Sequence, residues 1–248
     1  MNLVLFESSE LELPLARSDA RAAHVLDVLR RREGDSLDVG RVNGPRGKAI
    51  IRRITSSHLE LEFQWGAALP SRTTLTLIVG LPRPQTARKI LVEATTLGVS
   101  TLHFVSTERS DPNYAASTLW TSGEWRRHLL AGAAQAFDTR IPEVTWTKSL
   151  KELVGQMANG AVVPLNDHRL RLLALDNYEA GSRLGQVEIE PARSVCLALG
   201  PERGWGASDR DALRDHGFTL VHLGEPVLRT ETAMVVALGI VAARQGRM

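Results

Sequence analysis

The chain has little of what marks secreted and membrane proteins. Its 248 residues contain one cysteine, Cys196, so no disulfide can form within the chain and a reducing cytoplasm is the expected compartment. Cys196 lies in an apolar stretch, where burial suppresses thiol reactivity, and we interpret it as a core residue. No apolar run is long enough to cross a bilayer, and Met1-Asn2-Leu3 lacks the basic start of a signal peptide. We therefore expect a cytoplasmic protein with no membrane partner.

The sequence also lacks internal repeats, low-complexity segments and a G-x-G-x-x-G dinucleotide fingerprint, and we expect no metal site. Its 43% hydrophobic content suffices for one large domain or for a small and a medium one. The net charge is only +2, but arginine dominates the basic residues. Guanidinium groups suit phosphate, and their concentration in residues 30–53 favours a polyanionic partner over a merely solvated surface. The candidates for this contact are Arg30, Arg31, Arg32, Lys48, Arg52 and Arg53.

Residues 1–70 predict a small antiparallel β-barrel. A helix with Ser18 as N-cap is expected over 18–29, because its apolar residues share one face. Three short strands are expected after it, separated by turn residues, and 66–71 is the expected linker. The strands are predicted at 36–42, 48–54 and 59–65.

From Thr73 to the end the pattern alternates between strands and helices, which is typical of a mostly parallel α/β sheet. Residues 147–167 show no clear pattern. A helix that begins at Ser208 as N-cap and stops at Gly217 is well signalled. Strands are predicted at 74–79, 99–105, 170–175, 195–199 and 218–223, and helices at 85–97 and 124–137.

Two loops follow the last two predicted strands, at 200–206 and 223–233. Ligands of α/β sheets bind beyond the carboxyl ends of strands, so the two loops are expected to frame one pocket. Thr230 and Glu231 can be explained as the N-cap and first turn of a helix. Arg229 cannot, because its charge is unfavourable at the positive end of a helix. This arginine indicates a ligand or a bound anion.

The last helix, at 233–243, is apolar on every side and is therefore expected to be buried on every side. A terminal helix on the surface would show one polar face. Burial all round requires either that the helix threads into the domain or that a second subunit covers it.

These features together resemble the SPOUT superfamily of S-adenosylmethionine-dependent RNA methyltransferases. Within it the chain is most similar to the family that methylates N3 of a uridine in bacterial 16S ribosomal RNA. The motifs that carry the resemblance are Gly200-Pro201-Glu202-Arg203-Gly204, Leu223-Gly224, Leu228 to Thr232, Leu97-Gly98-Val99, Gln135 with Arg140-Ile141-Pro142, and His24 to Asp35. The chain departs from the family pattern at Arg203, where glycine is usual, and at Thr96 and Ala134, where glutamate is usual.

The resemblance implies a fold of two domains, a PUA-like β-barrel at 1–70 that binds RNA and a SPOUT domain with a deep trefoil knot at 73–248. It implies a homodimer that uses S-adenosylmethionine to methylate 16S ribosomal RNA or the 30S subunit. Arg229 would orient the base or a phosphate, and Glu231 and Glu202 are the nearest general-base candidates, with Asp176 a third. The implied cofactor-binding residues are Leu175, Leu199, Gly200, Pro201, Glu202, Gly204, Leu223, Gly224, Val227, Leu228, Arg229, Thr230, Thr232 and Ala233.

Two alternatives remain open from the sequence. One is a SPOUT enzyme that acts at another RNA position, such as a ribose 2′-oxygen. The other is a non-catalytic RNA-binding or ribosome-assembly protein.

Overall fold

The computed structural model describes residues 3–70, 72–159, 170–191 and 193–248, so Ser71 of the expected linker and part of the unpatterned stretch lie outside it. The chain forms two compact units. The N-terminal unit contains Met1–Ser71 and Leu130–Ile141, and the C-terminal unit contains Arg72–Leu129 and Pro142–Met248. The segment Leu130–Ile141 therefore packs within the N-terminal unit, although the sequence places it in the second domain.

The N-terminal unit is a curled five-stranded sheet in the order β1-β3-β4-β5-β2. The three predicted strands pair antiparallel, as expected. The edge strand β1 was not anticipated and pairs parallel with β3. No ladder joins β1 to β2 among the described residues, so a closed barrel stays a prediction. The strands are β1 (Val4–Phe6), β2 (Leu15–Ala16), β3 (Ser36–Arg41), β4 (Arg46–Ile54) and β5 (His58–Trp65).

The predicted helix of this unit is α1 (Ala20–Ala23), which continues as a π-helical turn over His24–Val28. Its N-cap is Asp19 rather than Ser18, because the Asp19 carboxylate accepts a hydrogen bond from the backbone N–H of Arg21 at 2.8 Å. The core of the unit lies between this helix, which contributes Val25, and the inward residues of the sheet, among them Ile51.

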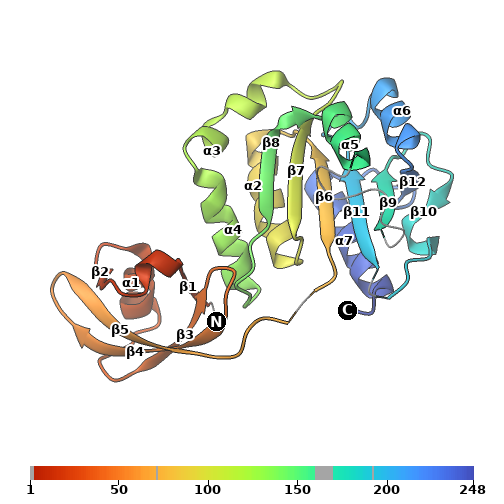
Figure 1. Cartoon of the computed structure of the whole chain (residues 1–248). Coiled ribbons are helices and arrows are strands. Elements are labelled where there is room, and N and C mark those ends of the chain that lie inside the picture. The colour runs from red at the N-terminus through yellow and green to blue at the C-terminus, as the bar shows by residue number, and fades with distance from the viewer. Residues whose placement is uncertain (1–2, 71, 160–169, 192) are drawn as a thin grey trace. The chain divides into compact units, whose positions relative to one another are not determined.

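The C-terminal unit is built on a seven-stranded sheet in the order β10-β12-β9-β11-β6-β7-β8 (Figure 1). All of its ladders are parallel, which confirms the predicted parallel α/β sheet. The strands are β6 (Leu75–Gly80), β7 (Thr101–Ser106), β8 (Glu143–Ser149), β9 (Leu170–Leu175), β10 (Ser182–Arg183), β11 (Ser194–Leu199) and β12 (Thr219–His222).

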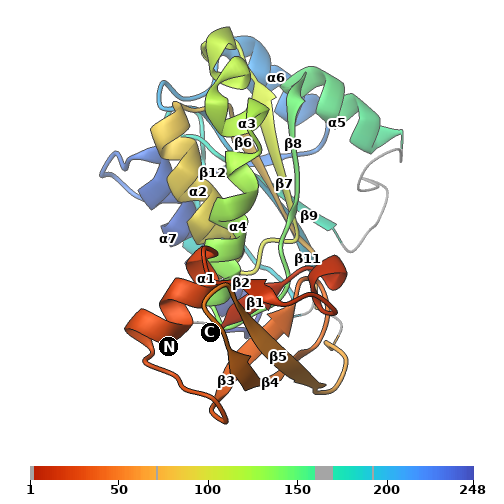
Figure 2. The same cartoon turned by 90° about the vertical axis from the view of Figure 1, so that its left-hand side faces the viewer.

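Helices cover both faces of this sheet. In the edge view α2 and α7 lie on one side, and α5 and α6 lie on the other (Figure 2). The central strands β6 and β11 are therefore almost wholly buried, as continuous apolar strands of a parallel sheet should be. The helices of this unit are α2 (Pro84–Thr96), α3 (Thr118–Thr121), α4 (Glu124–Gln135), α5 (Leu150–Ala158), α6 (Ala207–Asp215) and α7 (Thr230–Arg244), with 3₁₀ turns at Pro112–Ala116 and Leu184–Gln186. Helix α4 continues from Leu130 on into the N-terminal unit, which also contains a 3₁₀ turn at Ser8–Glu10.

Two predicted helix starts of the C-terminal unit were wrong. The N-cap of α6 is Gly206 and not Ser208, because the Asp209 carboxylate accepts the Gly206 backbone N–H at 2.9 Å. The N-cap of α7 is Arg229, and Thr230 is its first helical residue. Glu231 lies in the first turn of α7, as predicted.

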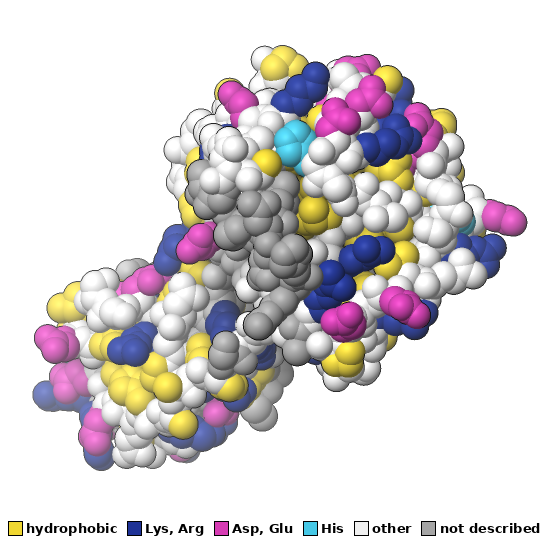
Figure 3. Space-filling view, turned by 45° about the vertical axis from the view of Figure 1, so that its right-hand side comes forward, with side chains coloured by type: hydrophobic (Ala, Val, Ile, Leu, Met, Phe, Trp, Pro, Cys, Tyr) yellow, Lys and Arg dark blue, Asp and Glu magenta, His cyan; other side chains and the backbone are white. Residues whose placement is uncertain are grey.

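The apolar helix α7 is not buried on every side within a single chain. Val235 is 38% exposed and Val236 is 39% exposed, and the exposed residues Thr232 and Ala243 extend the same stripe. On the face shown in Figure 3, basic and acidic side chains are interspersed. Within the described residues, no helix combines the length and the apolar character needed to cross a membrane.

Candidate functional site

Three loops meet at the carboxyl ends of β9, β11 and β12 and enclose a cavity of about 260 Å³, which we call the strand-end cavity. The three strands are neighbours in the parallel sheet, so their ends lie at one edge. The wall is formed by Leu175, Asp176, Asn177, Tyr178, Leu199, Gly200, Pro201, Glu202, Arg203, Gly204, Trp205, Leu223, Pro226, Val227, Leu228, Thr230 and Ala233.

The loop after β11 folds back on itself. A Cβ on Gly200 would lie 2.9 Å from the backbone of Gly204, so the fold of the loop excludes a side chain there. Gly204 adopts a positive φ of 68°. Arg203 does not, and the departure from the family glycine therefore carries no backbone strain. The Trp205 indole N–H donates to the carbonyl of Leu175 at 2.9 Å, which ties this loop to the end of β9.

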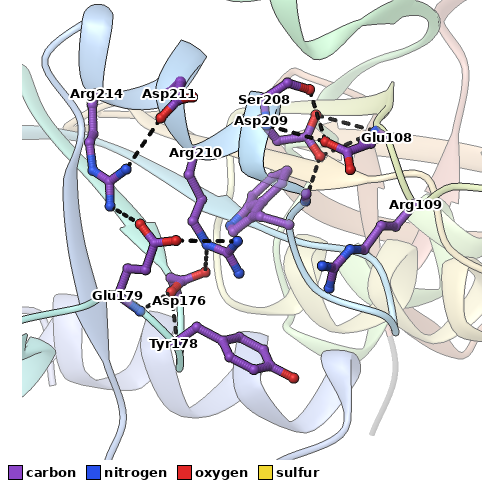
Figure 4. A network of polar contacts seen from close by, with 12 residues as sticks. Glu108, Arg109, Asp176, Tyr178, Glu179, Ser208, Asp209, Arg210, Asp211 and Arg214 are labelled. Carbon is purple, nitrogen blue, oxygen red and sulfur yellow. Dashed lines mark hydrogen bonds and ion pairs between the residues drawn. The ribbon is translucent and has the colours of Figure 1, made fainter.

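A cluster of acidic groups holds the start of α6 against the loop after β7 (Figure 4). The Asp209 carboxylate accepts backbone N–H groups from Gly206 at 2.9 Å and from Glu108 at 3.2 Å. The Ser208 hydroxyl, which the sequence assigns to capping, instead donates to the Glu108 carboxylate at 3.0 Å. The hydroxyl and the backbone N–H of Ser208 both donate to the Glu108 carboxylate and lower the pKa of Glu108. The cluster fixes the two loops to each other.

A second network fixes the loop after β9 (Figure 4). Asp176 accepts the backbone N–H groups of Tyr178 at 2.8 Å and Glu179 at 2.6 Å, which shapes the turn. Its other carboxylate oxygen accepts from Arg210 Nε of α6 at 2.7 Å, and both side chains are buried, at 2% and 6% exposure. Glu179 pairs with Arg210 and Arg214. Asp176 is thus engaged in structure, which leaves it a weak candidate for proton transfer.

A larger hollow of about 670 Å³, the α2 hollow, adjoins the strand-end cavity and shares Glu202, Val227, Leu228 and Thr230 with it. All three predicted catalytic residues, Glu202, Arg229 and Glu231, line this hollow. Helix α2 supplies the opposite wall with Thr86 and Lys89, which the sequence did not single out. The sequence could not predict these two residues, because α2 is distant in sequence from the loops that it faces.

The two carboxylates of the α2 hollow are both held by groups of α2 and its N-cap. Glu202 Oε1 accepts the backbone N–H of Arg83 at 3.0 Å and the Thr86 hydroxyl at 2.8 Å, so Glu202 caps α2 from a different loop. Glu231 Oε1 accepts from Lys89 Nζ at 2.9 Å. This bond, with the backbone N–H of Glu231 itself, lowers the pKa of Glu231, which is therefore ionised at neutral pH.

Most predicted cofactor-binding residues line the strand-end cavity, but three do not. Arg229 lines the α2 hollow instead. Gly224 and the exposed Thr232 line neither space, because Gly224 adopts a turn with φ 130° and Thr232 lies on the outer stripe of α7. The sequence missed Asp176, Asn177 and Tyr178 as wall residues. Their position directly after a predicted strand was the available signal.

The six predicted RNA-binding residues lie in the N-terminal unit and are exposed. Lys48 and Arg52 are each engaged with a carboxylate, at 2.7 Å from Asp38 and 2.5 Å from Glu62. Arg30 adopts a positive φ of 53°, which turns the chain within the run Arg30, Arg31, Arg32. Across the described ranges, no group of three or more His, Cys, Asp or Glu side chains could hold a metal ion.

Comparisons with known proteins point to one family. The sequence profile of the RNA methyltransferase domain matches residues 69–242. The ribosomal RNA small subunit methyltransferase E of Treponema pallidum is 33% identical over 98% of this chain and 91% of its own length. The protein named ribosomal RNA small subunit methyltransferase E 1 in Borreliella burgdorferi is 25% identical over 98% of each. A crystal structure of ribosomal RNA small subunit methyltransferase E from Neisseria gonorrhoeae bound to S-adenosyl methionine shares the fold, with a TM-score of 0.76, 21% identity and 97% coverage of both chains.

Proposed function

Because the chain belongs to the RNA methyltransferase family, and within it to the group of the ribosomal RNA small subunit methyltransferase E proteins, we propose that it methylates N3 of a uridine in 16S ribosomal RNA with S-adenosylmethionine as methyl donor. The observation that carries this proposal is the adjacency of the strand-end cavity to a hollow lined by Arg229, Glu231 and Glu202. One space has the character of a cofactor site, and the other has the charged groups that a reacting base requires.

The residues of the strand-end cavity fit S-adenosylmethionine. Leu175, Leu223 and Leu228 would offer apolar surface for the adenine ring, and the backbone at Gly200 would meet the cofactor with no side chain between them. The shared residues Glu202 and Val227 let a ligand of this cavity reach the α2 hollow. When bound, the cofactor would supply an activated methyl group on its sulfonium. The protein would contribute orientation and electrostatics.

For methylation at N3, the N3–H bond of the uridine must break before the nitrogen can take up a methyl group. The proton would pass to a carboxylate oxygen of Glu231 or Glu202, the two acidic side chains of the α2 hollow. Arg229 would stabilise the negative charge that develops on the base, because its exposed guanidinium has no carboxylate within 4.0 Å among the described residues. This role also explains a positive charge at the N-cap of α7.

We extend the proposal to the rest of the molecule. The N-terminal unit would be a PUA-like barrel that contacts 16S ribosomal RNA or the 30S subunit through Arg30, Arg31, Arg32, Lys48, Arg52 and Arg53, and the protein would act in the cytoplasm. The C-terminal unit would contain the trefoil knot of the SPOUT fold. The exposed apolar stripe of α7 supports a homodimer, because a second copy could cover Val235 and Val236.

The test is mass-spectrometric mapping of 16S ribosomal RNA from cells with and without this protein, repeated in vitro with the purified protein and S-adenosylmethionine. We expect one uridine to gain a methyl group at N3. A methyl group on a ribose 2′-oxygen would contradict the position, and cofactor binding without any transfer would favour a ribosome-assembly role. The variant Arg229→Met should lower kcat by about 100-fold while cofactor binding is retained, as expected for the loss of one charge-stabilising group.

A further inference from the structure

A third hollow of about 200 Å³ lies beside the two already described and is lined by three arginines from three different elements. Arg83 is the N-cap of α2, Arg109 lies in the loop after β7, and Arg203 lies in the loop after β11. This arginine hollow shares Arg83 and Glu202 with the α2 hollow, and Pro201, Glu202 and Arg203 with the strand-end cavity. A ligand there would be next to the reacting groups.

The three guanidinium groups form no ion pair with a carboxylate of the described residues. All three side chains are exposed, and none has a carboxylate within 4.0 Å among the residues that the structure describes. Other arginines of the unit do have such partners, as Arg88 does in Glu124 and Arg214 in Glu179. Gathering like charges around one hollow is unfavourable unless an anion enters it.

The acidic residues that line the arginine hollow already accept hydrogen bonds from the backbone. Asp111 Oδ1 accepts the N–H of Asn113 at 2.9 Å. Glu202 Oε1 accepts the N–H of Arg83 and the Thr86 hydroxyl. These hydrogen bonds hold both carboxylates in place. Among the described residues, neither carboxylate forms an ion pair with an arginine of the hollow. The positive groups remain available to an external ligand.

The backbone that carries these arginines is well held. Arg109 Nη1 donates to the carbonyl of Arg203 at 2.9 Å, which links the loops after β7 and β11. The Thr107 and Ser110 hydroxyls are 2.8 Å apart and brace the first of these loops. In Figure 4 the Arg109 side chain extends away from the cluster of Glu108, Ser208 and Asp209. The loops after β7 and β11 are therefore held to each other before a ligand binds.

We propose that Arg83, Arg109 and Arg203 form a subsite for a backbone phosphate of the RNA substrate, which seats the strand beside the methyl-donor cavity. The inference rests on the proposed function, since it supposes an RNA substrate. Planar guanidinium groups bind phosphate oxygens in pairs, and three of them line this hollow of about 200 Å³. Arg203 gives this chain a contact that a glycine at the same place could not make.

The experiment compares full-length Arg109→Ala, Arg109→Lys and Arg203→Gly with the wild type and with the matched control Arg127→Ala. Arg127 is an exposed arginine of α4 that lines none of the three spaces. Binding of a labelled oligouridylate is measured by fluorescence anisotropy between about 50 and 200 mM salt, and S-adenosylmethionine binding is measured by calorimetry. Arg203→Gly restores the family residue, so its loop has no reason to misfold.

Arg109→Ala and Arg203→Gly should each reduce the slope of log affinity against log salt by about 0.7, the value for one phosphate contact on a single strand. Arg109→Lys should retain most of the slope, Arg127→Ala should retain all of it, and cofactor affinity should not change. An unchanged slope in both variants would overturn the proposal. A loss of cofactor affinity with unchanged RNA binding would also overturn it, and would show that the anion is the cofactor carboxylate. Failure of the proposed function would appear separately, as a wild type that binds RNA but transfers no methyl group.

Discussion

His103 of β7 is a buried residue outside the site whose titration should affect stability. Its Nδ1 is 2.8 Å from the Thr145 hydroxyl, and its Nε2 has no partner among the described residues. Burial, with Lys148 nearby, lowers the pKa of His103 to about 4. The folded protein therefore keeps this ring neutral at a pH where the unfolded chain protonates it.

The contribution of His103 to stability should be complete above pH of about 6.5 and should fall as the pH drops towards 4, by about 1.4 kcal/mol per pH unit. His103→Gln removes the titration. Urea unfolding of the wild type and the variant at several pH values measures the difference between their free energies of unfolding. The two proteins share all other titrating groups, so the pH dependence of this difference comes from His103. Parallel curves between pH 6.5 and 4 would show that His103 does not titrate as described.

The ion pair between Lys89 and Glu231 can identify the proton acceptor. Removing Lys89 takes away the largest cause of the lowered pKa of Glu231, so that pKa should rise towards its ordinary value. If Glu231 accepts the proton, Lys89→Met should move the acidic limb of the kcat/KM profile to higher pH. The control Thr86→Val removes a hydrogen bond to Glu202 and leaves Glu231 untouched. A limb that stays in place in Lys89→Met would exclude Glu231 as the proton acceptor.

At the scale of elements, the contact between α6 and the loop after β9 depends on the buried pair of Asp176 and Arg210. Asp176→Asn would leave the Arg210 charge without its closest partner, and such a loss costs about 3 kcal/mol. Urea unfolding followed by tryptophan fluorescence measures the change. The matched variant Glu179→Gln removes a partner that is 43% exposed and should have a much smaller effect. If both variants lowered the free energy of unfolding equally, the buried pair of Asp176 and Arg210 would not be the main source of this stabilisation.

The sequence predicted the strands and the loops of the site but not what faces them. Central strands such as 195–199 are continuous apolar runs, and glycine and proline mark the loops that follow. Strand β8 and helix α5 were missed, although Ser149 and Glu152 form a capping box that could have located α5. Lys89 and Thr86 could not be found, since their contacts with Glu231 and Glu202 span 142 and 116 residues of sequence. Only the fold brings such groups together.

At the scale of the whole molecule, helix α7 presents a stripe of exposed residues on the surface of the chain. The exposed stripe of this helix follows helical spacing and consists of Thr232, Val235, Val236 and Ala243. Exposed valine side chains are more stable when a partner surface buries them. A second copy of the chain would bury this stripe. Helix α7 would then be buried on every side, as its apolar sequence predicts. In a closed dimer with twofold symmetry, one substitution would act on both sides of the interface.

Val236→Asp should therefore convert the proposed dimer into a monomer, because two uncompensated carboxylates would be buried at the interface. Sedimentation equilibrium of wild type and variant measures this directly. The control Val28→Asp changes an exposed valine of the N-terminal unit, which is 66% exposed, and should leave the mass unchanged. Val236 is already 39% exposed in the single chain, so the variant should fold. A wild type that is monomeric at all concentrations would exclude the dimer and leave the stripe for another partner.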